Sequence, residues 1–503
     1  MSTPQPATPN NPSTAISVQA APFRLDWSAR LMLFAVLSAI FLAAMDQTVV
    51  STALPTIARD LHGLAHLPWI ITAYLLTSTV CLPVYGKLGD LFGRKRLLQI
   101  AILIFLAGSA LSGLAQSLDA LVAFRALQGL GGGGLLVSAI AAISDFIPIT
   151  QRGRYQGLVG AAFGLATLIG PFLGGFIVET LSWRWIFYIN VPFGALSLGI
   201  IGLAFPARKK TPTPPLDLIG GLLLITGLSA LVIFASVAGS THALSGSGPW
   251  FLLAFGIGAL IAFALVENFH PEPLLPLAFF RYRTFTLSVI ISFFVGLAML
   301  GSLSFLPLYL QDVRGFTPTD SGLEMLFLLF GMLGTSIFSG RWISRTQRYR
   351  AFPVFGTLLI SVALGLLSTI GLTTTLWHID GMLVVLGVGL GMTMQVLVLS
   401  AQLSVEQKHL GVATATASLF RSMGGTLGVA GFGAVFAHFI GGMSLSDTTA
   451  GLAYQSRIVQ ALHVDFRVAA AVSLGAFGCA WFLEEMHHLP ARRSTISDDD
   501  SAG

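Results

Sequence analysis

The sequence predicts an all-α protein that crosses a membrane many times. Of its 503 residues, 54% are hydrophobic and only 10% are charged, whereas soluble domains carry about 25% charged residues. Apolar runs of about 19 or more residues alternate with short charged clusters, which is the pattern of a polytopic helical membrane protein. The alternating segments of about ten residues that are typical of a membrane β-barrel do not occur in the sequence.

Fourteen apolar segments are expected to span the membrane. They are 31–53, 67–86, 97–116, 119–143, 155–178, 186–205, 217–238, 249–267, 284–310, 321–341, 352–372, 379–402, 410–440 and 465–484. We group them into two six-helix bundles, 26–205 and 284–485, joined by a basic loop and two linking helices within 206–283. Residues 1–25, of which the first 22 carry no charge, are predicted to be a disordered tail, and residues 486–503 a second solvated tail.

The distribution of Lys and Arg predicts the orientation of these segments. If the N-terminus is inside, the inner segments hold 20 of the 27 basic residues, the outer segments hold 5, and Arg125 and Arg421 lie within spans. Inner loops of membrane proteins carry such an excess of positive charge. Both termini are therefore expected to be cytoplasmic, and this topology explains the basic pI without a nucleic-acid partner.

An internal repeat supports two related halves. Residues 86–96, "GKLGDLFGRKR", align with residues 340–350, "GRWISRTQRYR", at an offset of 254. A second pair of segments begins at Gln151 and Gln407 and aligns at an offset of 258. Parallel halves around a central site are an architecture of secondary transporters.

An acid lies in the first predicted span. Asp46 stands about two-thirds of the way along an apolar segment, where a carboxylate costs roughly 2.5–3.5 kcal/mol on insertion scales. We expect it to face a water-accessible cavity between the bundles, where it can be neutral when protonated and charged when exposed. Two interpretations stay open: Asp46 couples transport to protons or cations, or it is a structural ion-pair partner of Arg125.

The sequence resembles the major facilitator superfamily, and within it the fourteen-span drug:proton antiporters of the EmrB/QacA type. The resemblance covers roughly residues 30–485 and is strongest in the N-terminal half. It depends on five sequence motifs: "MDQTVVSTALP" in the first span, "GKLGDLFGRKRLL" after the second, "FRALQG" in the fourth, "GPFLGG" in the fifth and "SWRWIFYINVPFG" after it. Two residues depart from the pattern, because Ser51 stands where many members carry Asn and Ala166 where the antiporter motif usually has Gly.

The resemblance implies roles for particular residues. Asp46 and Arg125 would couple transport to protons; the fourth-span motif comprises Arg125, Gln128 and Gly129; the cytoplasmic gate motif comprises Gly86, Asp90, Gly93, Arg94 and Lys95; and the antiporter motif comprises Gly170, Pro171, Gly174 and Gly175. In the gate motif, Asp90 would pair with a base or a helix N-terminus in one conformation and release it in another. The alternative for this loop is a purely topological basic anchor, and the alternative for the fifth span is plain close packing.

Other motifs add little chemistry. Glu324 and Arg421 are candidates to line a substrate cavity, although each also fits an interfacial position. Residues 129–134, "GLGGGG", match a dinucleotide fingerprint formally but follow no strand. The two cysteines, Cys81 and Cys479, show neither disulfide nor metal-ligand spacing. We therefore expect no metal and no cofactor other than protons as the coupling ion.

The leading functional hypothesis is a proton-coupled antiporter in a bacterial inner membrane that exports amphipathic or cationic drugs and could thereby confer antibiotic resistance. The first alternative is a dedicated exporter of a lipid, a siderophore or an antibiotic made by the host, and a remote one is a non-transporting receptor or scaffold. The expected partners are small substrates, protons and membrane lipids, with a periplasmic adaptor and an outer-membrane channel as further candidates. An enzyme is not expected, because the sequence contains no nucleophile–base cluster.

Overall fold

A computed structural model describes residues 26–61, 67–205, 217–238, 246–271, 273–440 and 451–485, and all regular structure in these ranges is helical. The two predicted tails lie outside the described residues. The α-helices are α1 Trp27–Asp60, α2 Leu67–Phe92, α3 Arg94–Leu114, α4 Leu118–Phe146, α5 Arg152–Thr180, α6 Trp185–Tyr188, α7 Asn190–Ala204, α8 Leu218–Ala238, α9 Ser247–Phe269, α10 Arg283–Leu308, α11 Pro318–Thr346, α12 Ala351–Leu367, α13 Leu376–Leu403, α14 Leu410–Ile440 and α15 Gly451–Trp481. Short 3₁₀ or π turns occupy Ile149–Gln151, Leu277–Arg281, Tyr309–Val313 and Gln407–His409.

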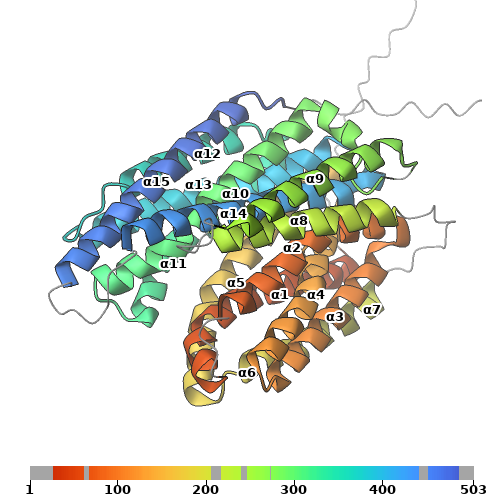
Figure 1. Cartoon of the computed structure of the whole chain (residues 1–503). Helices are drawn as coiled ribbons and strands as arrows, with labels where there is room; N and C mark the ends of the chain where they lie inside the picture. The colour runs from red at the N-terminus through yellow and green to blue at the C-terminus, as the bar shows by residue number, and fades with distance from the viewer. Residues whose placement is uncertain are drawn as a thin grey trace, which may run out of the picture.

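The helices form two groups that follow the order of the chain. Figure 1 shows α1 to α7, in red to yellow, gathered below α10 to α15, in green to blue. Helix α8 packs against α9 and also touches α2 and α14, so it lies at the boundary between the groups. Each group has its own hydrophobic core, and the first core extends onto Val398–Leu419 of α13 and α14. The two groups are therefore packed together where α13 ends and α14 begins.

Eleven helices in the described part of the chain are long and apolar enough to cross a membrane. Two further apolar helices, Ile219–Phe234 and Ala351–Leu367, are shorter. The chain is thus a multi-pass, all-helical membrane protein, whereas the predicted count of fourteen crossings stays a prediction. A helix occurs at every predicted segment, but Ile189 separates α6 from α7 within segment 186–205.

The largest difference from the predicted boundaries is at the last helix. Helix α15 begins at Gly451 rather than near residue 465. Ile458, Val459 and Leu462 are buried in the second core, whereas Gln460 between them is exposed, so this turn is amphipathic. Overall hydropathy underestimated this helix because only one side of its first half is apolar.

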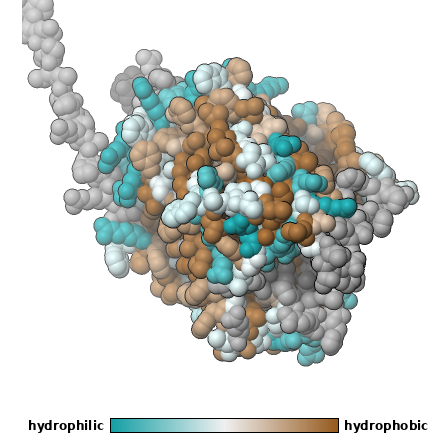
Figure 2. All heavy atoms as spheres, turned by 90° about the vertical axis from the view of Figure 1, so that its left-hand side faces the viewer, coloured by the Kyte–Doolittle hydropathy of each residue, from teal (hydrophilic) through white to brown (hydrophobic). Residues whose placement is uncertain are grey.

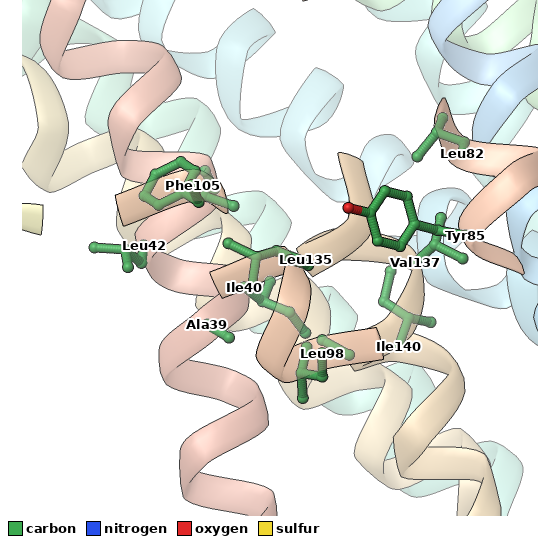
Figure 3. Packing of buried hydrophobic residues seen from close by; sticks show 14 of the residues in the cluster. Ala39, Ile40, Leu42, Leu82, Tyr85, Leu98, Phe105, Leu135, Val137 and Ile140 are labelled. Atoms are coloured by element: carbon green, nitrogen blue, oxygen red, sulfur yellow. The ribbon is translucent and has the colours of Figure 1, made fainter. Parts of the chain in front are cut away.

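Helix α4 is central to the first group, and its glycine run explains why. A Cβ atom at Gly131 would lie 2.3 Å from the backbone nitrogen of Phe105 in α3, and one at Gly133 would lie 2.2 Å from the carbonyl oxygen of Ser78 in α2. Figure 3 shows side chains from α1, α2, α3 and α4 meeting around α4. The segment 129–134 is therefore a site of close helix packing, as small residues permit in lipid.

Large apolar side chains are exposed on the outside of the helices. They include Phe172, Phe255, Leu265, Phe330 and Leu366. Figure 2 shows hydrophobic residues over much of one face, with hydrophilic residues interspersed. Exposed apolar surface on this scale indicates contact with membrane lipid rather than with water.

Candidate functional site

A buried polar cluster lies inside the first group of helices, around Asp46 of α1. Arg125 of α4 donates from Nη1 to Asp46 Oδ2 at 2.6 Å, and Gln128 donates from Nε2 to Asp46 Oδ1 at 2.8 Å. Arg125 and Gln128 are three residues apart and share one face of α4, and Arg125 also donates to Gln128 Oε1 at 2.7 Å. The structure therefore brings three of the predicted residues together.

Two further residues complete this cluster, and sequence reasoning missed both. Asn190, the first residue of α7, donates from Nδ2 to Asp46 Oδ1 at 2.8 Å and to the hydroxyl of Ser109 at 3.0 Å. Ser109 in α3 donates in turn to the carbonyl oxygen of Phe187 at 2.8 Å. The signal that could have found Asn190 is its position in "FYINVPFG", where an amide stands alone between apolar residues.

The cluster is sealed from solvent in this conformation. The exposed fractions are 2% for Asp46 and 1% for Arg125, and the Arg125 guanidinium carbon lies 4.3 Å from the centre of the Tyr74 ring. This differs from the expectation that Asp46 faces a water-accessible cavity. The physical reason is the ion pair. Two opposite charges in contact carry no net charge and can be buried together among helices, where either charge alone would be strongly unfavourable.

A glycine of α5 allows this helix to pack closely against α1, which carries Asp46. A Cβ atom at Gly170 would lie 1.9 Å from Thr48 Oγ1 of α1, and Thr48 Oγ1 also lies 3.4 Å from the carbonyl oxygen of Ala166. Gly174 is buried, whereas a Cβ atom at Gly175 would meet nothing within 4 Å. Pro171 belongs to α5, and its side chain lies outside the described residues. Gly170 of the antiporter motif therefore makes a tight contact with Thr48, which follows Asp46 by two residues in α1.

The motif expected in the loop after the second span begins in the last turns of α2, because this helix continues to Phe92. Its residues join the two groups of helices in what we call the first loop contact (Gly86, Asp90 and 410–412). Asp90 accepts hydrogen bonds from the backbone N–H groups of Gly411 at 3.0 Å and Val412 at 3.1 Å, at the start of α14. It also pairs with Arg94. A Cβ atom at Gly86 would lie 2.8 Å from the carbonyl oxygen of Gly411. Asp90 thus contacts both kinds of partner that the sequence predicted, a base and a helix N-terminus.

The remaining residues of the gate motif form the connection from α2 to α3. Gly93 has a φ angle of 89°, which favours glycine, and it precedes the first residue of α3. Arg94 donates from Nε to Asp145 Oδ2 at 3.1 Å. Lys95 donates to the carbonyl oxygens of Gly202 and Phe205, which satisfies the end of α7. These contacts hold the loop to its own group of helices while Asp90 reaches the other.

A second loop contact, which was not predicted, lies at the last turns of α11 (Gly340, Ser344 and 151–154). The backbone N–H of Arg154 donates to Ser344 Oγ at 2.8 Å, and a Cβ atom at Gly340 would lie 2.4 Å from the carbonyl oxygen of Gly153. Beside it is a cavity of about 440 Å³ lined by Gln151, Arg154, Arg341, Ser344 and Arg345. Both loop contacts therefore join the two groups at the end that is rich in basic residues.

The other predicted candidates lie apart from the Asp46 cluster. Glu324 is half-buried near the start of α11, and its Oε2 has no hydrogen-bond partner among the described residues. Arg421 lies in α14, where its backbone carbonyl packs against Gly296 of α10. The described residues contain no group of three or more His, Cys, Asp or Glu side chains that could hold a metal ion.

Comparison with known proteins agrees with this architecture. The family description "Major Facilitator Superfamily" matches residues 36–429. An uncharacterized MFS-type transporter of Mycobacterium tuberculosis is 40% identical over 449 residues, which are 89% of this chain and 65% of that protein. The chain therefore spans less than two-thirds of this relative's length. The multidrug transporter protein MdtP of Bacillus subtilis is 36% identical over 405 residues, which cover 80% of this chain and 75% of that protein.

Solved structures show the same fold at low sequence identity. The human organic anion transporter MFSD10 superposes with a TM-score of 0.63 at 15% identity, covering 91% of this chain and all of that one. The proton:xylose symporter XylE superposes with a TM-score of 0.61 at 14% identity, covering 91% of this chain and 96% of that one. With the helical architecture and the matched sequence, these findings place the chain in the Major Facilitator Superfamily.

Proposed function

We propose that the protein is a proton-coupled exporter of amphipathic or cationic compounds that works by alternating access in a bacterial inner membrane. The observation that carries this proposal is the buried cluster of Asp46, Arg125, Gln128 and Asn190, a charged site inside apolar helices. Ionisable residues within membrane spans mark ion or substrate pathways by default. Relatives whose names describe multidrug transporters support the substrate class.

The proposal includes a topology. Fourteen helices cross the membrane as two six-helix bundles, 26–205 and 284–485, with a linking pair within 206–283 and both termini in the cytoplasm. The basic end is then cytoplasmic, and both loop contacts close the path on that side. In this conformation the transporter is closed to the cytoplasm, and Asp46 is held by Arg125.

In the proposed cycle, Asp46 alternates between binding a proton and pairing with Arg125. When a proton binds Asp46, the carboxyl becomes neutral and its attraction to Arg125 weakens, so the packing of α1 against α4 can change. When the proton leaves toward the cytoplasm, the ion pair forms again. Glu324 and Arg421 are proposed to line the substrate path, and adaptor or outer-membrane channel proteins are optional partners.

The test uses the full chain in proteoliposomes, with ethidium as the substrate. Asp46→Asn should abolish ethidium-driven proton movement, measured with an internal pH dye, while ethidium binding survives at least in part. Asp46→Glu should keep some transport with a shifted pH optimum. Asp119→Asn, which changes an exposed acid in the first turn of α4, is the matched control. If Asp46→Asn vesicles exchange ethidium for protons at the wild-type rate, the acid is structural.

A second candidate function has its own support. A relative from Aspergillus aculeatus, named as the MFS-type transporter of the acurin A biosynthesis cluster, is 35% identical over 429 residues, 83% of this chain. A dedicated exporter of a compound made by the host therefore fits the same fold and coupling. Competition against ethidium transport by a panel of cationic drugs distinguishes the two, because a dedicated exporter should respond to few of them.

A further inference from the structure

We propose that Asp465 of α15 is a second proton-binding site, inside the second group of helices. The inference rests on the proposed function in one respect, because it assigns this proton to the same transport cycle. The location and the protonated state of the carboxyl follow from its burial and its surroundings alone.

The Asp465 side chain is buried inside the second group of helices. It is 1% exposed and lies fourteen residues after the start of α15, which is about 21 Å along a helix that rises 1.5 Å per residue. Neither carboxyl oxygen has a hydrogen-bond partner among the described residues. An isolated buried carboxylate costs several kcal/mol, so the carboxyl carries a proton in this conformation.

The charged groups around α15 are engaged elsewhere. This helix packs against α10, α12 and α14 and against the turn Tyr309–Val313; α12 contains no titratable residue. The described titratable side chains on the other packed elements and on α15 itself bind other atoms, face outward or lie at other depths: Arg283, Tyr309, Asp312, Arg421, Tyr454, Arg457, His463, Arg467 and Cys479. The side chain of His438 in α14 lies outside the described residues. None of the described groups neutralises an ionised Asp465.

A second buried polar side chain lies at the same depth on the facing helix. Arg283 and Glu484 are ion-paired at one end of the α10–α15 contact, and Gln455 donates to the carbonyl oxygen of Asp312 at the other. The chain is antiparallel in these two segments, and in each of them 29 residues separate the two contacts. Asp465 and Ser302 both lie 19 residues from the ion pair. Ser302 is 2% exposed, and its hydroxyl also has no partner among the described residues.

The internal repeat relates this place to the Asp46 cluster. The two halves align at offsets of 254 and 258, and Ser302 follows Asp46 by 256 residues. In the first half, the acid is on the first helix, and an amide partner, Asn190, is on the last. In the second half, the hydroxyl is on the first helix and the acid is on the last. The structure therefore places a second buried acid at the corresponding helix pair, with the two helices' roles exchanged.

The chemistry needs only proton transfer. Water reaching Asp465 in another conformation removes the proton and leaves a carboxylate, and return to the buried state requires a proton to be taken up from water. No bond other than O–H forms or breaks. Unlike Asp46, which keeps a counter-charge when deprotonated, Asp465 can be buried only in its neutral form, so its burial and its protonation are coupled.

The test is infrared spectroscopy of the purified full chain in lipid nanodiscs at neutral pH, with and without carbonyl-isotope-labelled aspartate. We expect a carbonyl-stretch band of a protonated aspartic acid that shifts with the label and disappears in Asp465→Asn. Asp312→Asn, a nearby acid hydrogen-bonded to Tyr454, is the matched control and should keep the band. Asp465→Glu, which retains a carboxyl if the amide variant misfolds, should keep a band that no longer responds to the aspartate label.

A transport measurement connects the site to the cycle. In proteoliposomes, Asp465→Asn should halve the number of protons moved per ethidium exported. The same aspartate band in the wild-type protein and in Asp465→Asn, or an unchanged proton-to-ethidium ratio, would overturn the inference. If Asp46→Asn retains normal coupling, the proposed function fails instead, while the infrared result still decides the protonation of Asp465.

Discussion

The last turns of α2 and the last turns of α11 make the same kind of contact with different chemistry. In each, a glycine lies against a backbone carbonyl of the other group of helices: Gly86 against Gly411, and Gly340 against Gly153. Four residues later in each helix, a side-chain oxygen accepts a hydrogen bond from the start of a helix of the other group. That oxygen belongs to a carboxylate in Asp90 and to a neutral hydroxyl in Ser344.

The neighbouring arginines follow this difference. Arg94 is 6% exposed and pairs with Asp90 and Asp145, whereas Arg348, at the aligned position, is 78% exposed and lies 3.9 Å from Glu485. A buried base needs a buried acid, so replacement of the acid by serine accompanies release of the arginine to solvent. Glycine therefore sets the geometry of both contacts, while charge sets how strongly each one holds.

The largest effect is expected at the charged contact. Asp90→Asn removes the charge that two backbone N–H groups and Arg94 share, and hydrogen bonds to charged groups contribute about 1.5–3 kcal/mol each. The closed population should fall by about tenfold or more, since tenfold corresponds to 1.4 kcal/mol. Pulsed electron resonance between spin labels at positions 92 and 406, with both native cysteines replaced by serine, measures that population.

The matched control for this change is Asp145→Asn. Asp145 also pairs with Arg94, but this contact lies within the first group of helices, and the Asp145 side chain is 45% exposed. It should therefore move the distance distribution much less. A wild-type distribution in well-expressed Asp90→Asn protein would remove the carboxylate from the closing mechanism.

A smaller effect is expected from the shared glycine geometry. Gly340→Ala places a methyl group 2.4 Å from the carbonyl oxygen of Gly153, and overpacking costs about 1–3 kcal/mol. The labelled pair at positions 149 and 346 should report a shift toward the separated state, and ethidium efflux should slow. Gly334→Ala, on the same helix with nothing within 4 Å, should leave both measurements unchanged. Equal behaviour of the two variants would contradict the close approach.

The smallest effect is expected at the neutral contact. Ser344→Ala removes hydrogen bonds with Arg154 and Gln151, and an uncharged hydrogen bond contributes about 0.5–1.5 kcal/mol. Efflux should fall by less than in Asp90→Asn, with the distance between positions 149 and 346 broadened rather than displaced. Ser339→Ala, which removes a hydroxyl that donates to the carbonyl oxygen of Ser336 within α11, is the control. An effect as large as that of Asp90→Asn would mean that charge does not distinguish the two contacts.

The local sequence predicted the parts of this structure that depend on local pattern. The lengths of the apolar runs predicted a helix at every segment where one is observed. The aligned glycines, Gly86 and Gly340, marked the segments at the ends of α2 and α11. Arg125 was found because it is a base within a predicted span, and Gln128 because it belongs to the fourth-span motif of the family that the sequence resembles. Asn190 and Ser109 were missed because their pairing with Asp46 depends on how α3, α7 and α1 meet in space. Ser344 was missed because a serine at a helix end has many ordinary roles, and only the partner helix gives it this one.

Helix α8 limits how the two groups can move. It touches α2 on one side and α14 on the other, and it is joined to α9 by a tight contact between Gly227 and Gly256. Any rocking that separates α2 from α14 must detach α8 from one of them, and lipid tails then fill the space at little energetic cost because they are as apolar as the helix they replace. The α8–α9 pair is therefore expected to move as a unit with one of the two groups. The surface of the other group that it leaves becomes covered by lipid, so the two surfaces can slide past each other within the membrane.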